Sequence, residues 1–272
     1  SYMKSSLESI TPGNTKIPRV HVGVDLGTAY TVLIVLDEDL EPLGGEYRFA
    51  QIVRDGLVVD FYGAIELVSE LKRKMELRLG FELTRAATSF PPGVALAEVK
   101  ATQNVLIAAG LECENVVDEP TAANAVLQVE NGAIVDVGGG TTGIAVIQEG
   151  KVVYTGDEPT GGTQFSLVIA GALDKEFEDA EDLKKDPRNH RRLFPIIRPV
   201  MEKVGRIVAR HVENYSVEAL YLVGGTCAFT GIDQVLQKET GLPTYIPSEP
   251  MFVTPLGIAR HDVGSESVGR MG

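Results

Sequence analysis

The stretch IVDVGGGTTGIAVI, at residues 134–147, places an acid, three glycines and two threonines between two runs of branched aliphatic residues. The aliphatic runs are typical of buried strands, so the polar residues between them predict a turn. Glycine has no Cβ, which lets backbone amides come close to another group. Asp136 and Thr141 flank the glycines at 138–140, so we expect that group to be polar. The alternative is an ordinary hairpin with a polar tip.

A second stretch, HVGVDLGTAYTVLIVL at residues 21–36, repeats this order of residue types. Asp25 takes the place of Asp136, and Gly27 and Thr28 take the place of the glycine-rich tip. A repeated unit of this kind predicts two duplicated lobes in one fold. Two facing tips would offer amide groups for phosphate oxygens and two carboxylates for hydrated Mg²⁺. The pair of motifs therefore predicts a site for a polyphosphate with a divalent metal.

Two further stretches carry candidate site residues. In VVDEPTAANAVLQV, Pro120 suits the first position of a helix, which predicts Glu119 as its N-cap. In EALYLVGGTCAFTGI, Gly224 and Gly225 lie between a strand and the start of a helix. The alternatives are that Glu119 serves only as a cap and that the two glycines form a plain strand exit.

Composition excludes several classes of function. The chain has 272 residues with 44% hydrophobic and 23% charged content, which is ordinary for a globular protein with a core. The net charge of −13 disfavours non-specific binding to nucleic acid or to an anionic membrane. Cys113 and Cys227 match no metal spacing and are expected to be buried apolar groups in a reducing cytosol. No secretory signal or membrane-spanning run is visible, and residues 1–17 are expected to be a flexible lead.

Strand-like and helix-like segments alternate, which indicates the α/β class. A hairpin is expected over 52–61 with its turn at Asp55-Gly56, and the charged segment 174–192 is expected to be a solvated surface segment. Apolar periodicity and stop residues predict helices at 63–79 ending at Gly80, 95–109, 120–131 closed by Gly132, 163–173, and a later one with Ile196, Val200, Val204, Ile207 and Val208 on its apolar face.

Four motifs, in order, resemble those of the actin-like ATPase superfamily, which includes actin, heat-shock chaperone ATPases and sugar kinases. The motifs VGVDLGTAYT, VVDEPTAAN, IVDVGGGTTG and YLVGGTCAFTGI resemble its phosphate-1, connect-1, phosphate-2 and adenosine motifs. The resemblance implies a two-lobed fold with ribonuclease H-like lobes, in a compact version with trimmed outer subdomains. We expect the first lobe at 18–131, the second at 132–252, and a segment at 253–272 that returns to the first lobe and ends in a frayed tail.

The resemblance also implies roles for single residues. Asp25 and Asp136 would hold Mg²⁺, largely through water, and Glu119 would position the attacking water. Gly224 and Gly225 would lie against the adenosine of ATP or ADP. The residues expected to grip the phosphates are Gly27, Thr28, Gly138, Gly139, Gly140 and Thr141.

The sequence departs from the chaperones in three ways. No motif places the lysine that assists phosphoryl transfer in their first lobe, because Lys72 and Lys74 are predicted on a solvated helix face. The adenosine motif lacks the usual basic residue after it, and we expect no separate peptide-binding domain. Nucleotide binding is therefore better supported than fast hydrolysis.

The stretches VRDGLVVDFYGA, AATSFPPG and MFVTPLGIA resemble a chaperone-like family of ethanolamine utilisation, encoded with proteins of a bacterial microcompartment. This implies a cytosolic protein that assists the assembly or reactivation of ethanolamine-degrading enzymes, with those enzymes or microcompartment proteins as partners. Oligomerisation is compatible with this resemblance. Other open readings are a polymerising actin-like scaffold, a protein-binding adaptor with little catalysis and, least favoured, a kinase of a small metabolite.

Overall fold

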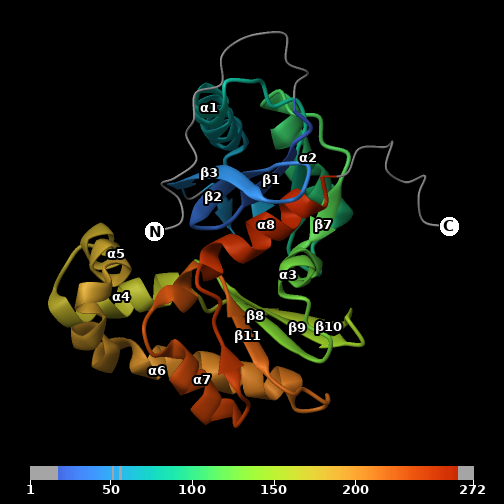
Figure 1. The fold of residues 1–272 in the computed structure, drawn as a ribbon. Coiled ribbons are helices and arrows are strands. Elements are labelled where there is room, and N and C mark those ends of the chain that lie inside the picture. Colours follow the sequence, from blue (N-terminus) through green and yellow to red (C-terminus); the bar gives the residue numbers. More distant parts are fainter. Residues whose placement is uncertain (1–17, 51, 55–56, 263–272) are drawn as a thin grey trace.

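Two five-stranded mixed sheets form the centres of the two halves of the molecule (Figure 1). The computed structural model describes residues 18–50, 52–54 and 57–262. The first sheet has the order β3-β2-β1-β6-β7 and the second has the order β10-β9-β8-β11-β12. In each, an antiparallel three-stranded meander is followed by two parallel strands, so the predicted duplication is present. The strands are β1 (His21–Leu26), β2 (Tyr30–Leu36), β3 (Pro42–Phe49), β6 (Ala87–Phe90), β7 (Val116–Asp118), β8 (Gly132–Val137), β9 (Thr142–Gln148), β10 (Lys151–Glu158), β11 (Leu220–Val223) and β12 (Thr244–Tyr245).

Helices α1 (Phe61–Leu79) and α2 (Leu96–Ala108) pack with the first sheet around a core that includes Val24 and Leu71. The Asp60 carboxylate accepts a hydrogen bond from the Gly63 amide at 2.9 Å, which starts α1 two residues earlier than predicted. The helix ends at Gly80, as expected. The predicted hairpin is present as the antiparallel pair β4 (Val53–Arg54) and β5 (Leu57–Val58), whereas its turn at Asp55-Gly56 lies outside the described residues.

The second sheet packs against α4 (Gly162–Leu173), α6 (Pro187–Val212) and α7 (Ile232–Thr240). The segment 174–192 is mostly exposed, as predicted, but it is not entirely solvated. It forms α5 (Phe177–Lys185) and the first turn of α6, because Ala180 is buried in the core and Glu181 pairs with Lys184 away from solvent. The short helices η1 (Gly225–Ala228) and η2 (Pro250–Phe252) follow β11 and precede the last helix.

Two helices, α3 (Glu119–Leu127) and α8 (Val253–Arg260), cross where the two halves meet (Figure 1). A Cβ at Gly257 would overlap the Ala122 carbonyl, so only glycine lets these helices approach so closely. Helix α8 also lies against β1, and the Asp262 carboxylate accepts a hydrogen bond from the Val22 amide at 3.0 Å. The end of the described chain is thereby joined to the first sheet.

Helix α3 ends five residues before Gly132, which begins β8 instead of closing the helix. The Asn124 side chain causes this difference. It accepts a hydrogen bond from the Val129 amide at 2.8 Å and donates one to the Val129 carbonyl at 3.2 Å, which turns the chain out of the helix at Gln128. No helix within the described ranges is long and apolar enough to cross a membrane, and Cys113 and Cys227 are both buried.

Candidate functional site

The tips of the hairpins β1–β2 and β8–β9 have the same turn. The Gly27 amide donates to the Tyr30 carbonyl at 3.0 Å, and the Gly138 amide donates to the Thr141 carbonyl at 3.0 Å. These two glycine amides are therefore used inside the turns. The amides that make no hydrogen bond in the described structure come from the residues that follow, which are Thr28 and Ala29 in the first tip and Gly139, Gly140 and Thr141 in the second.

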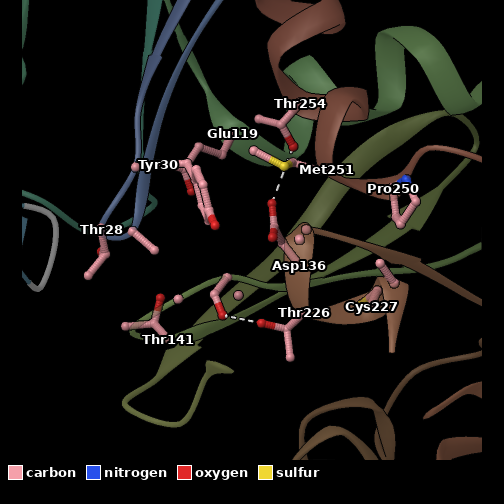
Figure 2. Close-up of a pocket in the computed structure, with 18 of the residues that line it drawn as sticks. Thr28, Tyr30, Glu119, Asp136, Thr141, Thr226, Cys227, Pro250, Met251 and Thr254 are labelled. Atoms are coloured by element: carbon pink, nitrogen blue, oxygen red, sulfur yellow. Dashed lines mark hydrogen bonds between the residues drawn. The ribbon is translucent and has the colours of Figure 1, made fainter. Parts of the chain in front are cut away.

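The two tips touch each other across the cleft between the lobes (Figure 2). A Cβ on Gly139 would overlap the Cβ of Ala29, and a Cβ on Gly140 would lie 2.9 Å from Cγ2 of Thr28. The φ angle of Gly139 is not positive, so close approach is the reason for glycine at this position. The free amides of both tips thus lie at one place, as the sequence predicted.

Two carbonyl groups of the second tip accept hydrogen bonds from other parts of the second lobe. The Gly138 carbonyl accepts hydrogen bonds from the Gly162 amide at 2.9 Å and from the Thr226 hydroxyl at 2.8 Å. The Gly139 carbonyl accepts from the Thr163 amide at 2.8 Å. Hydrogen bonds from the start of α4 and from η1 therefore anchor this tip to the rest of the second lobe. The amide groups of the tip point in the opposite direction from these carbonyl groups.

Three half-buried carboxyl groups lie beside the tips. Asp25 comes from β1, as the sequence predicted. Asp136 comes from β8 and Glu119 from the start of α3, also as predicted (Figure 2). Burial and then the nearby Asp136 raise the pKa of Asp25 to about 7, and burial raises the pKa of Asp136 to about 6. Burial, followed by repulsion from Asp25 and Asp136, raises the pKa of Glu119 well above its ordinary value.

Asp157 is a fourth acidic residue at the cleft, which sequence reasoning missed. It lies on β10 opposite Gly143 of β9, lines the same cavity, and raises the pKa values of Glu119 and Asp136. The signal was available in the stretch GDEPTGG, whose strand is the neighbour of the β8–β9 hairpin.

Glu119 is not the N-cap of α3, contrary to the prediction. The cap is Asp118, whose carboxylate accepts a hydrogen bond from the Thr121 amide at 3.0 Å. An aspartate two residues before the proline has the shorter side chain and the extended backbone that a cap needs. Glu119 occupies the first turn, and its carboxyl group is available to the cleft.

Gly224 and Gly225 lie where β11 meets η1. Gly224 has a φ of 89°, a conformation that favours glycine, and a Cβ there would overlap the Asp136 carboxylate. The Thr254 hydroxyl at the start of α8 donates a hydrogen bond to Asp136 at 3.2 Å (Figure 2). Asp136 is therefore in close contact with both the Gly224-Gly225 turn and α8.

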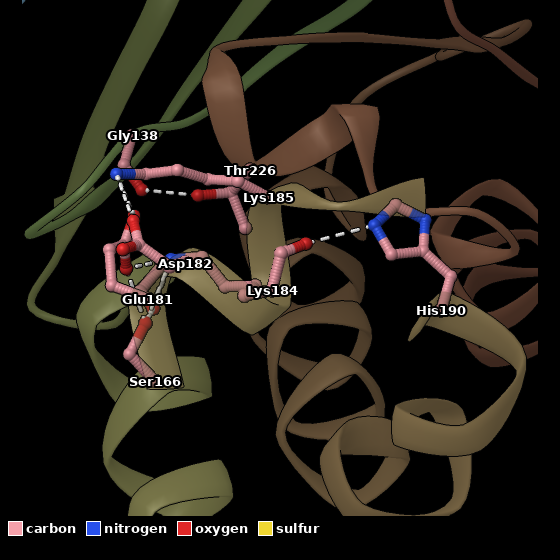
Figure 3. Close-up of polar contacts among 9 residues, drawn as sticks. Gly138, Ser166, Glu181, Asp182, Lys184, Lys185, His190 and Thr226 are labelled. Atoms are coloured by element: carbon pink, nitrogen blue, oxygen red, sulfur yellow. Dashed lines mark hydrogen bonds and ion pairs between the residues drawn. The ribbon is translucent and has the colours of Figure 1, made fainter. Parts of the chain in front are cut away.

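A buried lysine lies under the second tip, and no motif indicated it (Figure 3). The Lys184 ammonium donates hydrogen bonds to Glu181 at 2.6 Å, to the Ser166 hydroxyl at 2.9 Å and to the Gly162 carbonyl at 3.0 Å. Burial lowers the pKa of Lys184, while attraction to Lys184 outweighs burial and lowers the pKa of Glu181. Because the Gly162 amide holds the Gly138 carbonyl, Lys184 braces the base of the phosphate-loop candidate.

These groups line a cavity of about 910 Å³ between the lobes. This volume is within the range of about 300–1,000 Å³ that is usual for ligand pockets. Gly225, Thr226 and Met251 line it together with the tips and the acids. In the part of the chain that the structure describes, no group of three or more His, Cys, Asp and Glu residues is arranged to hold a metal directly.

The family models that match are those of the MreB/Mbl protein, over residues 45–180, and of the Type IV pilus assembly protein PilM, over residues 122–255. Ethanolamine utilization protein EutJ of Salmonella typhimurium is 42% identical over 250 residues, which are 92% of this chain and 88% of that protein. The chaperone protein HscA homolog of Pseudomonas aeruginosa is 30% identical over 187 residues, which are 61% of this chain and 30% of that protein.

Solved structures show the same fold. EutJ from Carboxydothermus hydrogenoformans has a TM-score of 0.87 and 48% identity, covering 90% of both chains. The PilM–PilN type IV pilus biogenesis complex has a TM-score of 0.76 at 16% identity, over 90% of this chain and 98% of that chain. MreB5 of Spiroplasma citri bound to ADP has a TM-score of 0.72 at 19% identity, over 88% and 94%. The fold is that of the actin-like ATPases, and the chain belongs to the family of ethanolamine utilization protein EutJ.

Proposed function

We propose that the cleft binds ATP or ADP with Mg²⁺ and that slow hydrolysis switches the two lobes between arrangements. The observation that carries this proposal is the meeting of two hairpin tips with free amides beside three half-buried carboxyl groups whose pKa values are raised. Backbone amides bind phosphate oxygens. Further support comes from MreB5 structures of the same fold, which are described as bound to ADP and to AMPPNP.

The carboxyl groups fit a hydrated divalent cation. Asp25 and Asp136 are half-buried and have raised pKa values, and a nearby cation would favour their charged forms. Mg²⁺ usually keeps several waters and takes only one or two carboxylates from a protein. This preference is compatible with the described residues, among which no group of three or more His, Cys, Asp and Glu could coordinate a metal directly. Asp25 and Asp136 would hold the ion largely through water, and the ion would neutralise charge on the phosphate oxygens.

The protein's own groups would supply the remaining chemistry. The amides at 28–29 and 139–141 would bind the phosphates, and the turn at Gly224-Gly225 would lie against the adenosine. Glu119 would accept a hydrogen bond from the attacking water and hold it in line. Phosphoryl transfer depends mainly on positioning and charge neutralisation, so a small set of groups is sufficient.

The cellular role that we propose is assistance to ethanolamine-degrading enzymes or to their microcompartment, by a cytosolic chaperone-like switch. Support comes from the EutJ relatives, named for ethanolamine utilization, and from the chaperone protein HscA homolog. The lobe boundaries at 131 and 252 belong to this proposal. Light scattering with and without ATP separates this switch from a polymerising scaffold, since only the scaffold would scatter more with nucleotide.

Calorimetry with ATP and ADP, with and without Mg²⁺, tests nucleotide binding. We expect Mg²⁺-dependent binding that Asp136→Ala weakens, because the cation loses one of its two nearest carboxylates. The control is Asp39→Ala, an exposed acid in the turn between β2 and β3. Absence of binding to the wild-type protein at millimolar ATP would contradict the proposal and favour the adaptor.

A further inference from the structure

The outer face of α6 is strongly basic, although the protein is acidic. This helix contains seven lysine or arginine residues and a single acid, Glu202, whereas the whole chain has a net charge of −13. All seven basic residues are exposed. We call them the α6 basic stripe: Arg188, Arg191, Arg192, Arg198, Lys203, Arg206 and Arg210.

Helical spacing puts the stripe on one side. At about 100° per residue the seven positions fall within a sector of about 140°, and the stripe is about 33 Å long at 1.5 Å per residue. The opposite side carries the core residues Leu193, Ile197, Val204 and Val208. Helix α6 packs on α4, α5, α7 and β9 of its own lobe, and in Figure 1 it lies on the far side from the first sheet. The stripe therefore faces outward.

The stripe is only partly neutralised by neighbouring acids. Four of its members have acidic partners at 2.7–3.6 Å, which are Asp186, Glu202, Glu239 and Glu158. The other three, Arg191, Arg192 and Lys203, have no acidic partner among the described residues. Exposed basic residues in excess on one helix indicate an electrostatically complementary partner.

Two exposed prolines, Pro195 and Pro199, lie in the middle of the stripe. Proline has no amide hydrogen, so the carbonyl groups four residues earlier, at Arg191 and Pro195, cannot accept their usual helical hydrogen bonds. The same face thus presents cationic donors and unused backbone acceptors. A protein segment offers both carboxylates and N–H donors, whereas a phosphate backbone offers only acceptors.

We propose that the α6 basic stripe docks a short acidic segment of a partner protein. Since α6 contributes a net charge of +6 to a chain of −13, the remainder of the chain carries −19. That remainder would repel an extended polyanion such as duplex nucleic acid or an anionic membrane. A segment that contacts α6 alone avoids this repulsion. The inference does not depend on nucleotide, because Arg191, Arg192 and Lys203 do not line the cleft cavity.

Fluorescence anisotropy of a labelled acidic peptide tests the proposal. The probe is a Glu-rich helical peptide about 20 residues long, measured at about 0.15 M salt, with a partner peptide in which Gln replaces each Glu. We expect the wild-type protein to bind the Glu peptide and not the Gln peptide. The triple variant Arg191→Glu, Arg192→Glu, Lys203→Glu should weaken binding by about tenfold or more.

The matched control reverses three exposed basic residues elsewhere, Arg73→Glu, Lys100→Glu and Lys151→Glu, for the same change in net charge. It should weaken binding less than about threefold, since distant charges are screened. Thermal melting checks folding, and glutamine at the three stripe positions replaces the reversal if that variant unfolds. No binding by the wild type, or equal losses in both triple variants, would overturn the proposal. So would tighter binding of a DNA duplex or of phosphatidylserine vesicles through the same three residues. Addition of ATP should leave peptide binding by each variant unchanged. A failure of the proposed nucleotide binding would therefore not affect this test.

Discussion

Glu119 is a residue whose chemical role can be separated from its structural one. The adjacent Asp118 provides the N-cap of α3, so the Glu119 carboxyl group is not needed to cap the helix. It is instead half-buried near Asp25 and Asp136, where like charges are costly. A carboxyl group kept in such surroundings destabilises the fold, which is typical of a group retained for chemistry. Substitutions at 118 and 119 should therefore have opposite effects.

We expect Glu119→Gln to preserve ATP binding and to slow single-turnover hydrolysis by about 10²–10⁴-fold. The amide has nearly the same size, but it is a poorer acceptor for the attacking water and cannot take its proton. Without nucleotide, the variant should be more stable than the wild type, because Asp25 and Asp136 do not repel an uncharged amide. Asp118→Ala is the control, with a loss of about 1 kcal/mol from the missing cap. Equal hydrolysis rates in an active wild type would contradict the catalytic role.

His190 makes a pH-dependent contribution to stability. Its Nε2 donates a hydrogen bond to the Lys184 carbonyl at 2.9 Å (Figure 3). Its Nδ1 accepts a hydrogen bond from the Thr230 amide at 3.1 Å, and its ring stacks on Phe229. This pattern requires the neutral ring, and burial lowers the pKa of His190. The unfolded chain therefore binds the proton more readily, and the contribution of His190 is lost as pH falls through about 6.5.

Denaturant unfolding of wild type and His190→Gln at two pH values measures this contribution. At pH about 7.5 the variant should be less stable by about 1–3 kcal/mol, because the Thr230 amide loses its acceptor. At pH about 5.5 the difference should shrink, since protonation already penalises the wild type. Using the difference between the two proteins cancels the titration of every other group. A difference that is constant or larger at low pH would show that the ring is not held neutral.

Among the elements, the two hairpin tips act as a pair. Gly139→Val should abolish nucleotide binding, because its side chain would collide with Ala29 of the opposite tip and push the tips apart. The fold of each lobe should survive, since the collision lies between the lobes. Gly171→Val is the matched control, at an exposed position of α4 where a Cβ meets nothing within 4 Å. Calorimetry and circular dichroism give the two readouts, and unchanged ATP affinity in a folded variant would contradict the phosphate-loop assignment.

The elements that the sequence predicted well carry local signals. The hairpins around Asp25 and Asp136 and the helix ending at Gly80 each combine an apolar period with a turn residue, and neighbouring residues determine both. The prediction at Glu119 was wrong because Asp118 and Glu119 both suit a helix start, and only the hydrogen bond to Thr121 distinguishes them.

Long-range partners explain the remaining differences. The segment 174–192 is so charged that it looked solvated, yet Glu181 and Lys184 satisfy each other and reach Ser166, which lies on another helix. Likewise, α3 ends early because Asn124 bonds to Val129 and also donates to the Gly150 carbonyl at 3.4 Å in a distant turn. Such contacts depend on tertiary structure and leave no periodic trace in the sequence.

Across the described molecule, the two lobes meet at the hairpin tips and at two further places. At the closed end, the Arg260 side chain of α8 donates to the Ala125 carbonyl of α3 at 2.7 Å, and Thr254 connects α8 to Asp136. At the other side, Lys185 of α5 lies 5.5 Å from the Tyr30 ring centre and 5.0 Å from that of Phe49, both in the first lobe. We expect the first contact to act as a pivot, so that the second influences how far the cleft opens.

We expect Lys185→Ala to open the cleft and to release nucleotide about two- to fivefold faster, because a cation–π contact of a partly exposed lysine contributes about 0.5–1 kcal/mol. Lys184 remains in place to brace the second tip, so binding itself should persist. Stopped-flow release of a fluorescent ADP measures the rate, and small-angle scattering of the nucleotide-free protein measures the opening. Lys175→Ala, an exposed lysine between α4 and α5, is the control. The scattering should change even if the cleft binds no nucleotide, since the contact joins protein groups only. If Lys185→Ala and Lys175→Ala match the wild type in both measurements, the lobes are held together by the pivot and the tips alone.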